Sequence, residues 1–153
     1  MEDARIPVRY AHCELEGFGL TDNWRNPTLE RAKSLSERFA QEYPTSTPFG
    51  LLFMGPPGVG KTHLAVGIIR KLIRDKSVRC LFRTFPDSLN EVTILTTNYL
   101  EQEDLKSARK SVSFSLTERI GSPTRSRLYE MCKTVVMQGE DFRQRFKPDE
   151  HRL

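Results

Sequence analysis

The sequence lacks any apolar run that approaches the ~18 residues of a membrane-spanning helix. Its longest apolar stretches cover only residues 51–54 and 64–69, so we expect no membrane partner. The first five residues, Met-Glu-Asp-Ala-Arg, have neither the basic start nor the apolar stretch of a signal peptide. Secreted and membrane-embedded classes of protein are therefore disfavoured, and we expect a cytoplasmic location.

Cysteine is also scarce. The three cysteines, Cys13, Cys80 and Cys132, are odd in number and far apart. This pattern is typical of free thiols in a reducing compartment rather than of a disulfide framework. Neither the pair His12-Cys13 nor His63 nor Cys132 shows the ligand spacing of a metal site. We therefore expect neither a structural disulfide nor a zinc finger.

What the sequence does contain is typical of one globular domain. Its 153 residues are 37% hydrophobic and 29% charged, which leaves enough apolar side chains for a core. Lys and Arg number 24 against 20 Asp and Glu, and the formal charge of +4 permits a polyanionic partner without requiring one.

The hydrophobic periodicity predicts helices that alternate with short strands. Helices are expected over 27–43, 61–75 and 116–132, the first behind an Asn26 cap and the last interrupted by Gly-Ser-Pro at 121–123. Strands are expected over 49–54, 78–85, 92–96 and 134–137. The polar stretch 107–115 is expected to be a mobile loop.

The most specific motif is Gly-Pro-Pro-Gly-Val-Gly-Lys-Thr at residues 55–62, which matches G-x4-G-K-[ST] between a predicted strand and a predicted helix. Its glycines allow a concave loop whose N–H groups face phosphate oxygens, next to the positive end of a helix. Lys61 is suited to neutralise β- and γ-phosphate charge, and the Thr62 hydroxyl to bind Mg²⁺. The alternative is a Gly/Pro turn with a solvated lysine. The predicted cofactor-binding residues are Gly55, Pro56, Pro57, Gly58, Val59, Gly60, Lys61, Thr62 and His63.

The stretch 50–65, Gly-Leu-Leu-Phe-Met-Gly-Pro-Pro-Gly-Val-Gly-Lys-Thr-His-Leu-Ala, resembles the AAA+ ATPases of the DnaC/IstB type, which are bacterial helicase loaders and transposition helpers. Further similar segments follow the family's order, at 6–10, 16–18, 81–85, 93–100, 118–120, 126–130 and 139–143. The resemblance implies an α/β P-loop NTPase fold, a three-layer sandwich around a central parallel sheet. It also implies ATP and Mg²⁺ as cofactors, a replicative helicase or a transposase as partner, and assembly into homo-oligomers.

The resemblance further implies roles for residues outside the glycine loop. Asn98, at the end of a predicted strand, corresponds to the sensor-1 residue that positions the attacking water. Arg127, or alternatively Arg119, corresponds to an arginine finger, a role that suits a permanently charged, forked guanidinium. From the residues alone, Asn98 is a turn former and either arginine is a solvated helix residue. Arg143 is similar to a distal arginine near the nucleotide.

A basic cluster near the end of the helix predicted over 61–75 has two interpretations. A positive groove would suit single-stranded DNA, which a helicase loader contacts. Cations near a helix C-terminus are also ordinary partners of the helix dipole. The cluster consists of Arg70, Lys71, Arg74, Lys76 and Arg79.

One part of such an ATPase is missing from the sequence. No predicted strand ends in the adjacent carboxylates of a Walker-B motif, which hold Mg²⁺ and orient water. Lys61 and Asn98 are 37 positions apart, and only residues 86–91 separate the two strands predicted between them. Six residues are too few for a parallel crossover. We therefore infer an internal deletion near residues 86–92, an incomplete central parallel sheet and impaired hydrolysis.

The predicted organisation is a single domain, in which residues 1–48 form an irregular segment plus an amphipathic helix and residues 49–153 form a truncated P-loop ATPase core. We expect an ATP-binding protein that resembles a helicase loader of DNA replication. The alternatives are an IstB-like transposition helper, a nucleotide-binding module without turnover, and a nonfunctional fragment. A small P-loop kinase is disfavoured by the Pro-Pro in the loop and by Thr-Thr-Asn at 96–98. The missing strand also predicts poor stability, association or a rearranged sheet.

Overall fold

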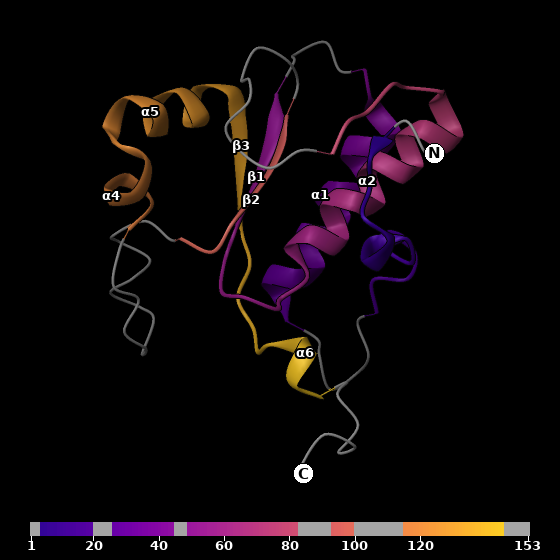
Figure 1. Cartoon of the computed structure of the whole chain (residues 1–153), viewed down its shortest axis with the longest axis horizontal. Helices are drawn as coiled ribbons and strands as arrows, with labels where there is room; N and C mark the ends of the chain where they lie inside the picture. Colours follow the sequence, from indigo (N-terminus) through magenta and orange to yellow (C-terminus); the bar gives the residue numbers. More distant parts are fainter. Residues whose placement is uncertain (1–3, 20–25, 45–48, 83–92, 100–114, 146–153) are drawn as a thin grey trace.

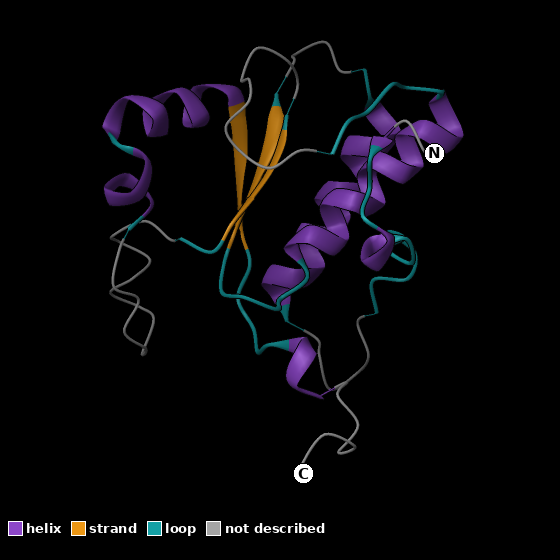
Figure 2. Cartoon of the chain, viewed as in Figure 1, coloured by secondary structure: helices purple, strands orange, loops and turns teal. Residues whose placement is uncertain are grey.

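A parallel three-stranded sheet forms the centre of the protein (Figures 1 and 2). The computed structural model describes residues 4–19, 26–44, 49–82, 93–99 and 115–145. Strand β1 (Gly50–Met54) lies between β2 (Ile94–Thr97) and β3 (Cys132–Val136), and it runs parallel to both. The predicted α/β class with a parallel sheet is therefore confirmed.

Helices cover both faces of the sheet and make three layers, as predicted. Figure 1 shows α1 (Pro27–Glu42) and α2 (Lys61–Lys76) on one side, and α4 (Leu116–Ile120) and α5 (Ser122–Met131) on the other. Successive side chains of a strand point to opposite faces, and every residue of β1 is buried. Leu51 and Phe53 belong to the core beneath α1 and α2, whereas Leu52 and Met54 belong to the core beneath α4 and α5.

The helices begin and end where their capping residues predict. The Asn26 side chain accepts a hydrogen bond from the Thr28 amide at 2.9 Å, and Pro27 occupies the first position of α1. Gly121, at a φ of 79°, separates α4 from α5. Ser115, which we expected in a mobile polar segment, is buried and forms a capping box with Glu118. Residues 107–114 of that segment lie outside the described residues.

The prediction of a strand over 78–85 is wrong for residues 78–82, which the structure describes. Residues 78–82 are irregular, and residues 83–85 lie outside the described part of the chain. The Phe82 amide donates to the Ala4 carbonyl at 2.8 Å, so this segment is tied to the N-terminal region instead of to a sheet neighbour. A strand needs a ladder partner for its backbone groups, and the described residues 78–82 pair with neither edge of the sheet β2-β1-β3.

The N-terminal region packs on the same core as the rest of the chain. Leu15 and Phe18 are buried in one cluster with Leu64 and Ile68 of α2. The division of the chain at residue 48 stays a prediction. Within the described ranges, no helix combines the length and the apolar character needed to cross a membrane.

Candidate phosphate-binding site

The loop that connects β1 to α2 has the backbone form that the motif predicts. Gly58 and Gly60 have φ angles of 79° and 95°, in the left-handed region that only glycine adopts without strain. Both also lie too close to neighbours to carry a side chain. An added Cβ would lie 2.4 Å from the Phe18 ring at Gly60, and 1.7 Å from the Asp141 carboxylate at Gly58. The loop leads directly into the N-terminus of α2, which is the end of a helix that attracts anions.

Lys61 lies inside this loop. Its side chain is buried, and its ammonium donates hydrogen bonds to the carbonyls of Gly55 at 2.8 Å and Pro56 at 2.6 Å. Burial, together with the nearby charge of Arg143, lowers the pKa of Lys61 to about 8, although Asp141 acts in the opposite direction. The ammonium is thus held within its own loop, where an arriving phosphate would favour its charged form.

A C-terminal segment covers the same loop. The Phe142 amide donates to the Gly58 carbonyl at 3.1 Å, just before α6 (Phe142–Arg145). The Asp141 carboxylate accepts from the Arg143 amide at 2.9 Å, beside Gly58. Residues 139–143 form one of the segments similar to the family, but the position of Asp141 beside the loop was not predicted. The similarity of residues 139–143 to the family was the only signal that could have indicated it.

Thr62 and His63 follow Lys61 on the first turn of α2, and both are partly exposed. The imidazole Nε2 of His63 lies 2.8 Å from the Glu14 carbonyl oxygen, and its ring meets the Phe18 ring edge-on at 5.5 Å. Burial lowers the pKa of His63. These contacts join His63 to the N-terminal segment, and its predicted role in cofactor binding stays a prediction, as does the role of the Thr62 hydroxyl at Mg²⁺.

Asn98 lies at the same edge of the sheet as the loop. It follows β2 directly and is exposed, and the Gly55 amide donates to the carbonyl of the preceding Thr97 at 3.3 Å. The carboxyl ends of parallel strands are where α/β proteins place their ligands. This position is compatible with a sensor-1 role, which stays a prediction.

The two arginine-finger candidates lie in the other helical layer. Arg119 belongs to α4, and its guanidinium lies over the Tyr99 ring at 5.8 Å from the ring centre. Arg127 belongs to α5 and is exposed. The loop lies between β1 and α2, so neither arginine shares an element with it. A finger acts on a neighbouring subunit's nucleotide, and both assignments stay predictions.

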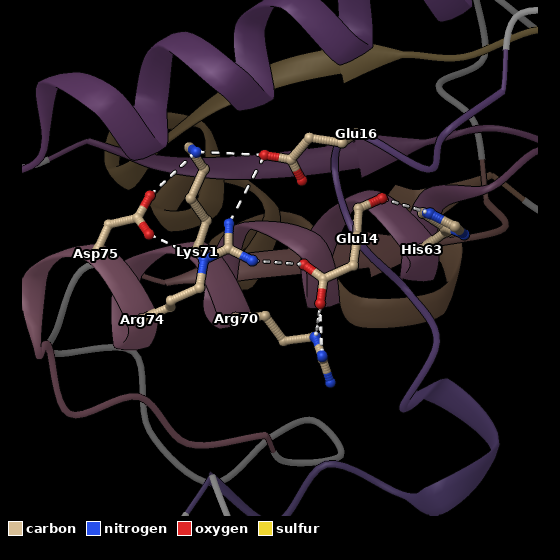
Figure 3. A network of polar contacts seen from close by, with 7 residues as sticks. All are labelled: Glu14, Glu16, His63, Arg70, Lys71, Arg74 and Asp75. Carbon is tan, nitrogen blue, oxygen red and sulfur yellow. Dashed lines mark hydrogen bonds and ion pairs between the residues drawn. The ribbon is translucent and has the colours of Figure 1, made fainter.

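Three members of the basic cluster, Arg70, Lys71 and Arg74 of α2, form ion pairs within the chain (Figure 3). Glu14 pairs with Arg70 at 2.5 Å and with Arg74 at 3.4 Å, and Asp75 pairs with Lys71 at 3.1 Å. The Lys76 ammonium donates to backbone carbonyls at the end of α1 and just beyond it. These contacts favour the structural interpretation of the cluster over a positive groove for single-stranded DNA.

Within the described part of the chain, no strand ends in adjacent carboxylates. β1 leads into Gly55, β2 into Asn98 and β3 into Met137. Residues 86–92, where we infer the deletion, lie outside the described residues.

Comparison with known proteins identifies the fold. No protein-family model matches the chain, and none of the curated proteins matches it. Among solved structures, the crystal structure of the DnaC helicase loader is similar, with a TM-score of 0.66 and 22% sequence identity over 86% of this chain and 99% of that chain. The chain therefore shares the α/β fold of that structure.

Proposed function

We propose that this protein binds the phosphates of ATP through Gly55–Thr62 and hydrolyses ATP very slowly. The observation that carries the proposal is the buried Lys61 ammonium, held by two carbonyls of a glycine loop at the N-terminus of α2. A solvated lysine after an ordinary turn would have no reason to lie buried in that loop. The phosphate oxygens would replace the two carbonyls as partners of the ammonium.

The residues at the loop fit a nucleotide with Mg²⁺ in part. When bound, the metal would neutralise phosphate charge, and the Thr62 hydroxyl is the group in the motif that would hold it. Mg²⁺ usually keeps several waters and needs few protein ligands, so binding is compatible with this single hydroxyl. Hydrolysis also requires side chains that orient the attacking water, usually a pair of carboxylates. The described strands offer Asn98 at the edge of the sheet but no carboxylate pair beside it.

We further propose a role similar to that of a helicase loader, with a replicative helicase as partner. The support is the similarity in fold to the DnaC helicase loader together with the ordered family segments in the sequence. An ATP-bound protein that rarely turns over would act as a nucleotide-dependent binding partner. Assisting a transposase is the alternative that the same fold permits.

Binding of a fluorescent ATP analogue in the presence of Mg²⁺ tests the proposal. Lys61→Ala removes a charge-assisted hydrogen bond to phosphate, which is worth about 1.5–3 kcal/mol, so we expect affinity to fall roughly 10- to 100-fold. Lys133→Ala removes an exposed lysine from β3 and is the matched control. Equal binding by the wild type and Lys61→Ala would refute phosphate binding at this loop.

Phosphate release measured on the same samples separates binding from turnover. We expect release on the order of 10²-fold slower than in an ATPase with a complete water-orienting pair. Robust Lys61-dependent hydrolysis would contradict the inferred loss of the Walker-B strand. Failure to bind together with a non-cooperative thermal transition would instead identify a nonfunctional fragment.

A further inference from the structure

Two histidines and a cysteine from distant parts of the sequence meet beside the first turn of α2. His12 and Cys13 belong to the N-terminal region, and His63 lies 50 positions further along the chain. One potential ligand atom from each residue lies within 4.8 Å of the other two. The Cys13 sulfur is 3.9 Å from the His12 Nε2. Sequence spacing gave no indication of this cluster, because only folding brings His63 to the other two residues.

His63 has one ring nitrogen hydrogen-bonded to the backbone, which leaves the other available to a metal. Its Nε2 lies 2.8 Å from the Glu14 carbonyl oxygen (Figure 3), a distance at which a neutral imidazole donates its N–H. The other ring nitrogen, Nδ1, then carries the free lone pair. Donation from one ring nitrogen to a backbone carbonyl is the usual way in which proteins fix the orientation of a ligating histidine. Edge-on contact with Phe18 further restrains the ring.

The Glu14 carbonyl is itself held in place. The Glu14 side chain forms ion pairs with Arg70 and Arg74, both on α2 (Figure 3). These pairs hold the N-terminal region against the helix that carries His63. Because Glu14 directly follows Cys13, the same contacts fix the position of the Cys13 sulfur relative to His63.

The three groups also suit one class of cation. Cys13 is buried, whereas His12 is exposed and has its Nε2 3.9 Å from the Cys13 sulfur. Zinc bonds of about 2.1 Å to nitrogen and 2.3 Å to sulfur place tetrahedral ligands roughly 3.5 Å apart, close to the distance between the Cys13 sulfur and the His12 Nε2. One thiolate and two imidazoles select zinc-like metals over Mg²⁺ or Ca²⁺, which prefer oxygen.

We propose that His12, Cys13 and His63 form a binding site for Zn²⁺, with the fourth position open to solvent on the side of the exposed His12. The site shares no residue with the loop Gly55–Thr62 proposed to bind ATP and does not depend on that proposal, although a role in cofactor binding is also predicted for His63 from the sequence. Zn²⁺ would cross-link the N-terminal region to the first turn of α2. It would therefore restrain the residue that follows Lys61 and Thr62.

A nucleophilic cysteine is the main alternative for this cluster. The Cys13 side chain is buried, whereas reactive cysteines are at least partly exposed to their substrates. Without another feature that activates the sulfur, metal binding is the better explanation of a cysteine beside two histidines.

Titration of the full-length, chelator-treated protein with Co²⁺, followed by displacement with Zn²⁺, tests the site. We expect one Co²⁺ per chain, visible bands of a tetrahedral ion and a thiolate-to-cobalt charge-transfer band, all lost on addition of Zn²⁺. His12→Ala should weaken Zn²⁺ binding by at least about tenfold, the effect of losing even a supporting residue. Since His12 is exposed, this variant should keep the wild-type circular dichroism spectrum. Cys13→Ala should remove the charge-transfer band.

Cys80→Ala and His151→Ala remove the same residue types elsewhere in the chain and are the matched controls. Both should bind Co²⁺ as the wild type does. Unchanged Zn²⁺ affinity in His12→Ala would overturn the proposal, and so would a Co²⁺ spectrum that lacks the thiolate band. If Cys80→Ala and His151→Ala lost Co²⁺ binding as much as His12→Ala and Cys13→Ala do, the metal would not bind specifically at His12, Cys13 and His63.

Discussion

The thiol of Cys132 lies at the end of the sheet where the three strands begin. Cys132 begins β3 opposite Gly50 of β1, where an added Cβ would lie 3.0 Å from the sulfur. The thiol also donates toward the Thr93 carbonyl at 3.8 Å, just before β2. All three strands therefore meet at this sulfur. Burial raises the pKa of Cys132 to about 11, because an ionised thiolate has no solvation there.

We expect this raised pKa to make the folded protein lose stability at high pH. The ordinary thiol pKa is 9.0, so between about pH 9 and 11 the unfolded chain releases a proton that the folded chain retains. The protonated Cys132 thiol makes its full contribution to the free energy of unfolding below pH 9. As the pH rises through 11 this contribution is lost, and the loss is about 2–3 kcal/mol for a pKa shift of two units. Urea denaturation midpoints at pH 8 and pH 10.5 measure the loss.

Lysine and tyrosine side chains also titrate in this range, so the comparison needs a variant without the thiol. Cys132→Ala should show a smaller drop in the urea midpoint between the two pH values than the wild type. Cys80→Ala, which removes a less buried thiol, should behave more like the wild type. Parallel pH profiles for the wild type and Cys132→Ala would contradict the assignment.

The loop at residues 55–62 was the part of the site that could be predicted from sequence. Its backbone form is dictated locally, because glycine at fixed spacing is required wherever φ is left-handed or a neighbour approaches closely. Asp141 and the cluster of His12, Cys13 and His63 could not be predicted in this way. Their proximity results from long-range packing, and no local pattern encodes which exposed or buried side chains will meet.

Gly67 places a packing requirement inside α2. Helix propensity alone predicts that Gly67→Ala stabilises the protein by about 1 kcal/mol. An added Cβ would, however, lie 2.9 Å from both the Leu15 amide nitrogen and a Leu15 methyl carbon. The backbone of the N-terminal region cannot move away without loss of its contacts on α2. We therefore expect Gly67→Ala to destabilise the protein by roughly 1–3 kcal/mol, as overpacked core positions do.

Thermal or urea denaturation of Gly67→Ala checks the sign of this effect. Gly17→Ala is the control, because the nearest atom to its added Cβ is 3.7 Å away. That variant should change stability little. A more stable Gly67→Ala protein would mean that the N-terminal region is held less tightly on α2 than the buried Leu15 indicates.

Periodicity predicted the long helices well and the short strands less well. α1 and α2 each have an apolar face, a cap and sixteen residues over which the pattern accumulates. The segment 78–82 has the β-branched and aromatic residues of a strand, yet its described residues are irregular. A segment forms a strand only where a neighbouring strand is available to pair with it. Whether such a neighbour is present depends on the whole sheet and cannot be predicted from residues 78–85.

In the described part of the chain, β2 forms one edge of the sheet. Among the described residues, β2 pairs only with β1. Leu51 donates to the Thr93 carbonyl and Gly55 to the Thr97 carbonyl, so the backbone groups of residues 93, 95 and 97 face β1. Those of Ile94 and Thr96 therefore face the outer edge, since backbone groups alternate along a strand. Such an edge is a template for pairing with another chain.

We expect the protein to self-associate through this edge. Sedimentation velocity should show an average mass that increases with protein concentration. Thr96 is exposed, and Thr96→Lys adds the edge charge that natural sheets use against such pairing, so association should weaken while the melting temperature changes little. Ser126→Lys adds the same charge on the exposed surface of α5 and should leave association unchanged. Equal association by both variants would place the contact elsewhere, and a monomer at all concentrations would show that the edge of β2 is not open to a second chain.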